Sequence, residues 1–259
     1  MRPRSLRSCL TLIALALSSA PIHADSSLPD ARSLVEGHIA ASGGQSALER
    51  QMNSTMTGRF AMPAAGMEGQ ITLYSRTPTE RAIEIDLPGI GLIQSGYSDG
   101  QAWSVDPFMG PRLMSGAELK MQIESNEPGA LMRSDEFVDS MQTVGMAEYD
   151  GKACYEVDVV WKSGRESSDC YSVDSGLLLA SEGRVESPMG VMETMTVFSD
   201  YKTYESDGVE LILPAMTEVT TMGQQQQLII DAIVLGSPAD EYFDLPPAIV
   251  TLKADQAAN

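Results

Sequence analysis

The sequence has 259 residues, with 36 Asp and Glu against 17 Lys and Arg and a formal net charge of -19. Nucleic acids and anionic membrane surfaces attract basic proteins, so this balance argues against nucleic acid and against stable membrane insertion. The length fits one domain of ordinary or larger size, and no change in composition marks a linker.

The first 24 residues have the features of a secretory signal peptide. Arg2, Arg4 and Arg7 precede an apolar run at residues 10–17, and small residues lead to Ala24. The apolar run is shorter than the ~20 residues that a membrane-spanning helix needs. We therefore expect an exported, soluble protein of the periplasm, with residues 25–259 forming a single domain.

Few residues suited to catalysis or metal binding remain outside that segment. His38 is then the one histidine, and Cys154 and Cys170 are the two cysteines. This excludes a metal site made of several histidines, and a Ser-His-Asp triad would depend on His38 alone. We expect no metal and no cofactor.

The chain after the predicted signal peptide begins with a segment that has helical spacing. Leu34, Val35, His38 and Ile39 recur at this spacing behind Asp30, which is suited to cap the helix. The glycine pair at residues 43–44 predicts the end of this helix, and residues 45–51 suggest a second, short one.

Beyond Asn53 the hydrophobic period changes to two, which is typical of strands with one buried face. Asp-Gly pairs at 99–100, 150–151 and 207–208 separate strand-like runs and indicate tight hairpins, so the sheet should be antiparallel. Strands are predicted at 67–73, 80–87, 141–149, 153–162, 168–174, 177–186, 191–204, 209–222 and 225–236, with a short one near Phe243.

Residues 116–140 interrupt this pattern. Apolar residues there stand among Glu, Lys, Gly and Asn, which predicts short helices broken at Pro128-Gly129. Such helices are available to cover one face of the sheet and to enclose a cavity.

Methionine is unusually common, with 16 residues in the chain. Several lie in or near the segment 116–140: Met109, Met114, Met121, Met132, Met141 and Met146. Because methionine is flexible and polarizable, it suits surfaces that accept varied apolar ligands, although it also fills ordinary cores. Both interpretations remain open.

Cys154 and Cys170 lie on the same face of two neighbouring predicted strands. In an oxidising compartment this arrangement favours a disulfide that closes a loop of about 15 residues, worth roughly 3 kcal/mol. A pair of free or redox-active thiols is the alternative, although such pairs more often have the C-x-x-C spacing.

The run Gly96-Tyr97-Ser98-Asp99-Gly100 matches the G-x-S-x-G pattern of hydrolases. That motif requires a strand, a turn and a helix, with a histidine downstream of the serine. Here a strand-like run follows, and no histidine lies downstream. We interpret Ser98 as a residue of a hairpin turn and expect no enzyme.

Three segments, taken together, resemble the outer-membrane lipoprotein-sorting proteins, the LolA-like group. They are residues 69–78 (GQITLYSRTP), residues 98–103 (SDGQAW) followed by Asp106-Pro107-Phe108, and residues 243–247 (FDLPP). The resemblance implies an incomplete antiparallel β-barrel covered by short α-helices, a hydrophobic cavity for acyl chains, and a periplasmic carrier. It also implies that Arg76 contacts the lid helices, although Thr77 separates this arginine from Pro78.

The first hypothesis is therefore a carrier of lipid or lipoprotein acyl chains, which receives cargo from an inner-membrane donor and passes it to an outer-membrane acceptor. The alternative is a lipid-sensing regulatory module of the same fold that acts on a partner protein. Residues predicted to line the cavity are Ile71, Leu73, Ile83, Ile85, Leu92, Trp103, Met121, Leu131 and Met132.

Overall fold

A computed structural model describes residues 28–76, 80–98, 100–125, 130–187 and 190–258. The predicted signal peptide, residues 1–24, lies outside these residues, as does the predicted helix break at residues 128–129. No helix in the described ranges is long and apolar enough to cross a membrane.

The strands of the described ranges form one sheet of 13 strands, in which every neighbouring pair is antiparallel. They are β1 (Asn53–Met62), β2 (Met67–Arg76), β3 (Glu80–Leu87), β4 (Gly91–Ser98), β5 (Gln101–Asp106), β6 (Gly110–Leu113), β7 (Val138–Tyr149), β8 (Lys152–Trp161), β9 (Glu166–Ser172), β10 (Leu178–Ser187), β11 (Gly190–Ser206), β12 (Val209–Thr221) and β13 (Gln224–Leu235).

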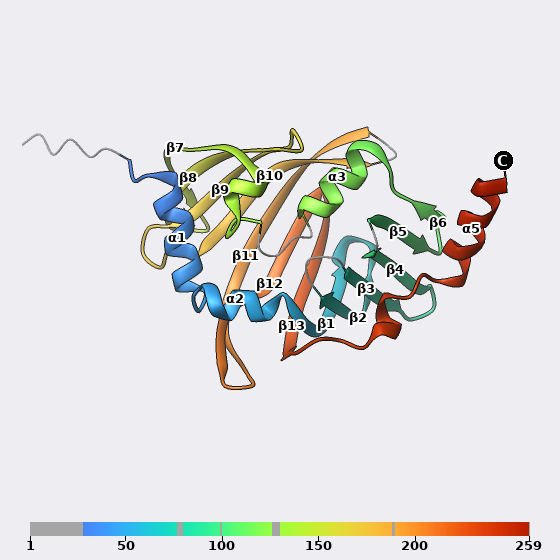
Figure 1. Cartoon of the computed structure of the whole chain (residues 1–259). Coiled ribbons are helices and arrows are strands. Elements are labelled where there is room, and N and C mark those ends of the chain that lie inside the picture. Colours follow the sequence, from blue (N-terminus) through green and yellow to red (C-terminus); the bar gives the residue numbers. More distant parts are fainter. Residues whose placement is uncertain (1–27, 77–79, 99, 126–129, 188–189, 259) are drawn as a thin grey trace, which may run out of the picture.

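Short helices accompany the sheet, and Figure 1 shows that it curves around three of them, α1, α2 and α3. The helices are α1 (Ala31–Ala41), α2 (Gln45–Gln51), η1 (Pro63–Ala65), α3 (Gly116–Ser125), α4 (Ser134–Phe137), η2 (Asp240–Phe243) and α5 (Pro247–Ala258). The predicted fold class, an incomplete antiparallel barrel with short helices, is confirmed.

The order of the strands shows where the barrel is open. The order is β6-β5-β4-β3-β2-β1-β13-β12-β11-β10-β9-β8-β7, so two meanders join where β1 pairs with β13. Strands β6 and β7 follow one another in the chain, yet they are the two edges of the sheet. The segment between them, which contains α3 and α4, must therefore pass from one edge to the other.

Tight turns build these meanders as the Asp-Gly pairs predict. Asp150 and Asp207 have φ of 48° and 50°, and the glycines after them have φ of 72° and 71°. Two successive positive φ angles match the twist of the flanking strands, and Asp followed by Gly tolerates them. The Ser98 pattern is also a hairpin, because β4 ends at Ser98 and this residue pairs with Gln101 of β5.

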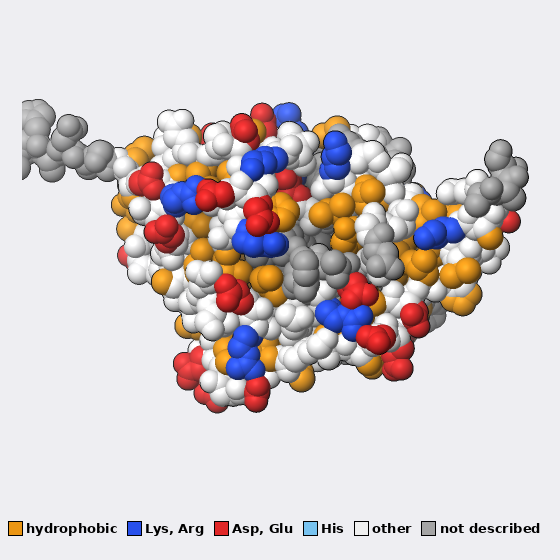
Figure 2. All heavy atoms as spheres, viewed as in Figure 1, with side chains coloured by type: hydrophobic (Ala, Val, Ile, Leu, Met, Phe, Trp, Pro, Cys, Tyr) orange, Lys and Arg blue, Asp and Glu red, His pale blue; other side chains and the backbone are white. Residues whose placement is uncertain are grey.

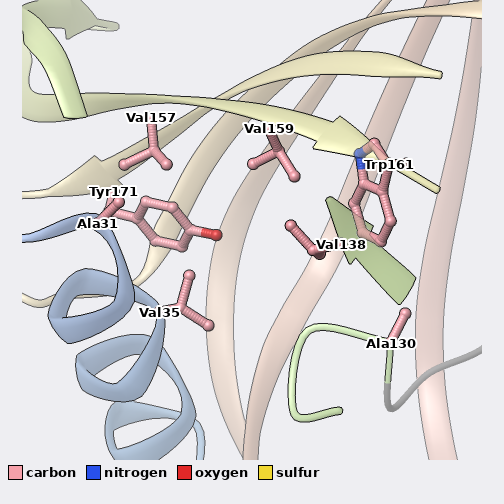
Figure 3. Close-up of a cluster of buried hydrophobic side chains, with 8 residues drawn as sticks. All are labelled: Ala31, Val35, Ala130, Val138, Val157, Val159, Trp161 and Tyr171. Carbon is pink, nitrogen blue, oxygen red and sulfur yellow. The ribbon is translucent and has the colours of Figure 1, made fainter. Parts of the chain in front are cut away.

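Helix α1 packs on what we call the inner face of the sheet. Its residues Ala31 and Val35 lie against Val157, Val159 and Tyr171, as Figure 3 shows. The predicted cap is confirmed, because the Asp30 carboxylate accepts a hydrogen bond of 3.1 Å from the Ser33 amide. This packing fixes α1 across β7 to β9.

The C-terminal region differs from the prediction. A short strand was expected near Phe243, but Asp240–Phe243 is a 3-10 helix, and α5 follows it. Pro238, Pro246 and Pro247 lack the amide hydrogens that a strand ladder needs, whereas Pro247 suits the first turn of α5. The prediction also omitted β6, a four-residue edge strand whose Pro111 is tolerated only at an edge.

Candidate binding site

The inner face of the sheet becomes strongly apolar from β1 to β4. Phe60, Ile71 and Leu87 are buried there, at 9%, 5% and 2% exposure. Around them lie side chains that the structure covers only in part: Met62, Leu73, Ile83, Ile85, Ile90, Ile93 and Leu228. The result is a continuous apolar surface with limited cover.

Strand register places this apolar surface on the same face as α1. One row of residues crosses the sheet from β8 to β12, and each residue pairs with the next: Val157, Asp169, Ser181, Thr196 and Val219. Thr217 lies two residues before Val219, and its row continues through Leu228 to Phe60. Because residues two apart in a strand share a face, both rows belong to the inner face.

Four of the predicted cavity residues are direct neighbours here. Ile71 pairs with Ile85, and Leu73 pairs with Ile83. Directly paired side chains lie about 5 Å apart, so they form one apolar patch. The structure thus brings these four together.

Leu92 and Trp103 lie on the outer face. Ile85 pairs with Ile93, so the preceding Leu92 points the other way, and it is 44% exposed. Trp103 pairs with Gly96, where an added Cβ would lie 2.6 Å from the indole Cζ2. Period-two alternation shows which residues of a strand share a face, but it does not show which face is the inner one. The prediction therefore placed Leu92 and Trp103 with the cavity residues, although both lie on the opposite face.

Trp103 instead lines a pocket of about 250 Å³ between the outer face and the C-terminal segment. The other side of this pocket comes from Tyr242, Leu245 and Pro246. Trp103 is only 3% exposed. Its place is therefore under η2 and the chain that leads to α5.

The remaining predicted residues come from the segment between the edge strands. Leu131 and Met132 line a pocket of about 330 Å³ together with Val35, Ile39 and Met141. Met121 belongs to α3, but its side chain lies outside the part of the chain that the structure describes. Two of the three thus lie beneath α1, away from the Ile71 patch.

Helix α3 connects the two ends of the sheet. At one end, Glu118 accepts hydrogen bonds of 2.7 Å from Arg112 of the edge strand β6. At the other end, Glu124 contacts the turn between β8 and β9, where Ser163 Oγ donates over 2.6 Å and Arg165 Nε over 3.1 Å. The helix is thus held across the open side of the half-barrel.

The contact of Glu124 is the better shielded of the two. Its side chain is 5% exposed and that of Arg165 is 14% exposed, and the guanidinium lies 4.0 Å from the centre of the Trp161 ring. This ion pair could not be predicted from the sequence, because 41 residues separate the two charges. No motif or short spacing in the sequence predicts that Glu124 and Arg165 meet.

Arg76 holds a different part of the chain from the one predicted. Its guanidinium bonds Glu80 over 2.6 Å, contacts Asp240, and lies 4.5 Å from the centre of the Phe243 ring. The stacking of Tyr74 on Tyr242 fixes the same segment. In the described ranges Arg76 therefore ties η2 to the outer face of β2 rather than to α3 or α4.

A buried polar cluster lies where α1 meets β9. Asp169 is 4% exposed and accepts hydrogen bonds from Ser181 Oγ over 2.6 Å and from Tyr171 Oη over 3.4 Å. Burial raises the pKa of the Asp169 carboxyl and of the Tyr171 phenol. His38 packs on Tyr171, and burial lowers the pKa of its imidazole to about 4.

Because of this lowered pKa, His38 should make stability depend on pH. The unfolded chain takes up the imidazole proton near pH 6.5, whereas the folded protein takes it up only near pH 4. Wild type therefore loses stability from this group as the pH falls through this window, by up to about 3 kcal/mol. His38→Gln should lack this loss, so urea denaturation at pH 7 and pH 4.5 should show a smaller decrease in the variant.

The comparison between the two proteins isolates His38. Asp169 has a raised pKa and acts in the opposite direction, but it is present in both proteins. Equal pH dependence in wild type and variant would show that the imidazole stays accessible to protons in the fold.

The predicted disulfide is present between Cys154 and Cys170, with Cα atoms 5.5 Å apart. Both sulfur-bearing side chains are buried on the outer face, next to Leu179, Ala180 and Tyr149. The bridge joins the start of β8 to the end of β9, at the end of the hairpin that lies away from the turn that Glu124 contacts. It therefore stiffens the hairpin that receives one end of α3.

In the described ranges no group of three or more His, Cys, Asp or Glu side chains could hold a metal ion. What the inner face offers is apolar area, and apolar area attracts apolar ligands by removing them from water.

Comparison with solved structures identifies this architecture. A LolA superfamily protein from Nitrosomonas europaea matches with a TM-score of 0.50 and 12% identity, over 84% of this chain and 99% of that chain. A domain of the outer membrane lipoprotein-sorting type from Vibrio parahaemolyticus matches with a TM-score of 0.53 and 11% identity, over 82% of this chain and 95% of that chain. No family model matches the sequence, and no curated protein matches it. At these identities the likeness establishes the architecture alone: the chain has a LolA-like fold.

Proposed function

We propose that this protein is a periplasmic carrier that binds lipid or lipoprotein acyl chains on the inner face of the sheet and delivers them toward the outer membrane. The observation that carries the proposal is the half-covered apolar patch of Ile71, Leu73, Ile83 and Ile85 on the inner face of the sheet. Each CH₂ of an acyl chain that leaves water there contributes about 0.8 kcal/mol.

The way α3 is held suits a ligand that must enter and leave. A helix of ten residues owes its stability to packing and to its contacts at both ends. Its described anchors are two ion pairs, Arg112–Glu118 and Arg165–Glu124. Release of either anchor would free one end of α3 at the open side of the half-barrel, and donor and acceptor proteins would supply and collect the cargo.

The export of the chain rests on the predicted signal peptide at residues 1–24. The acidic composition would keep the carrier from adhering to anionic membrane between its partners.

Placing a charge in the patch tests the proposal. Ile85→Asp should weaken binding of a fluorescent 16-carbon fatty acid at least about tenfold, because the carboxylate must be desolvated against apolar surface. The measurement is a fluorescence titration, with circular dichroism to show that the sheet remains folded.

Leu92→Asp is the matched control, since Leu92 precedes Ile93, the cross-strand partner of Ile85, but lies on the outer face. It should leave the affinity unchanged. Equal affinities in both variants would contradict binding at the inner face. Transfer of the bound fatty acid between vesicles would then separate a carrier from a lipid-sensing module, which would bind without transferring.

A further inference from the structure

The outer face of the sheet contains a second, larger hollow. An open groove of about 1060 Å³ crosses β8 to β12 on the side away from α1. All its described lining residues belong to these strands or to the turn at Met222-Gly223. No helix residue is among them, so no described helix covers this part of the sheet face.

Strand register shows which side chains point into the groove. One row crosses five strands in pairs: Asp158, Ser168, Glu182, Met195 and Thr220. This row is out of phase with the inner row that contains Val157 and Asp169, so it lies on the outer face with Cys154 and Cys170. The groove and the Ile71 patch are therefore on opposite faces.

The groove combines negative charge with exposed apolar side chains. Four consecutive strands contribute one carboxylate each, namely Asp158, Glu166, Glu182 and Glu193. Arg184 is the one basic residue in the described lining, and its guanidinium lies 3.8 Å from Glu193. Val191 and Met222, which also line the groove, are 63% and 72% exposed.

The spacing of the carboxylates favours a polymeric cation over a metal ion. No described group of three or more such side chains could hold a metal ion. Asp158 and Glu182 lie two strands apart, which is roughly 9–10 Å at the ~4.8 Å spacing of strands. An extended chain in the polyproline II conformation rises ~3.1 Å per residue with three residues per turn. Basic side chains three residues apart then lie on one side, about 9 Å from one another, and would reach both carboxylates.

We propose that this groove docks an extended segment of a partner protein in which lysine or arginine recurs about every third residue between apolar residues. The carboxylates would pair with the basic side chains, and Val191, Met195 and Met222 would cover the apolar ones. Anionic membrane and a second copy of this acidic chain fit less well, because both would bring like charge to the groove.

A synthetic probe tests the docking. A fluorescein-labelled 12-residue peptide with lysine at every third position and leucine or valine between should bind, as measured by fluorescence anisotropy at about 0.1 M salt. The same peptide with glutamate for lysine should not bind. The double variant Asp158→Asn, Glu166→Gln should weaken binding of the lysine peptide at least about fivefold.

A charge-matched control separates docking from general attraction. Asp86 and Asp174 are exposed and lie outside the groove lining, so Asp86→Asn, Asp174→Asn removes the same charge. It should change the affinity less than about twofold. Equal weakening by the two double variants would overturn the proposal.

A cross-linking experiment places the probe. A benzophenone label on Met222→Cys should capture the peptide, whereas the same label on Val250→Cys of α5 should not. Capture of a second copy of the protein through Met222→Cys would assign the groove to self-association and would also overturn the proposal. Fatty-acid binding should be unchanged in the groove variants. Failure of the peptide to bind would therefore leave the proposed carrier function untouched, and failure of fatty-acid binding would leave the proposed docking groove untouched.

Discussion

Replacing Glu124 by alanine is expected to lower the free energy of unfolding by about 3 kcal/mol, because the change leaves the shielded guanidinium of Arg165 without its ion-pair partner. Ser163 loses its acceptor in the same change. Urea denaturation measures the loss. Hydrogen exchange should show faster exchange in α3, since its anchor to the β8–β9 turn is gone.

Glu118→Ala is the matched control in the same helix. Its pair with Arg112 is more exposed, at 22% and 27%, so solvent screening should limit the loss to about 1 kcal/mol or less. The double variant Glu124→Leu, Arg165→Leu should recover much of the stability, because it removes both buried charges together. An equal loss in Glu124→Ala and Glu118→Ala would contradict a special role for the shielded pair.

Removing the disulfide is the second change with a large expected effect. Cys154→Ala, Cys170→Ala should lower the free energy of unfolding by about 3 kcal/mol, because the bridge restricts a loop of about 15 residues in the unfolded chain. Alanine avoids placing an unpaired hydroxyl at positions that are 0% and 4% exposed. Denaturation curves of the oxidised wild type and the double variant give the difference.

Reduction supplies the control for this experiment. Wild type treated with dithiothreitol should approach the stability of the double variant, whose own curve should not move with the reductant. If reduction leaves wild type unchanged, the bridge contributes nothing to stability.

Much of the sheet could be predicted because strand signals are local. The alternation in residues 67–73 and 80–87 was enough to give Ile71, Leu73, Ile83 and Ile85 a common face. The same alternation placed Cys154 and Cys170 side by side, and the bridge is present. The helix α5 was missed, although Pro247 at its first turn was a usable signal.

Leu92 and Trp103 show what local sequence patterns could not predict, namely the face of the sheet on which a residue lies. Both are large and apolar and stand in strands, so hydrophobicity alone assigns them to a cavity. Only the register across β3, β4 and β5 shows that they point outward. For Trp103 the C-terminal segment then supplies the cover, and no periodicity in β5 contains that information.

The sequence by itself determined the period-two alternation of the strands, the tight turns, the cap of α1 and the disulfide. Each of these depends on residues within about 16 positions of one another, so pattern and spacing carry the physical cause.

The tertiary structure alone decided how α3 closes the open side and what Arg76 holds. Glu124 meets Arg165 across 41 residues, and Arg76 meets Asp240 across 164. The pairing of β1 with β13 brings β2 close to the segment after β13, where Arg76 meets Asp240. Side chains so distant in the chain have no periodic relation to one another, so only the folded sheet decides which of them meet.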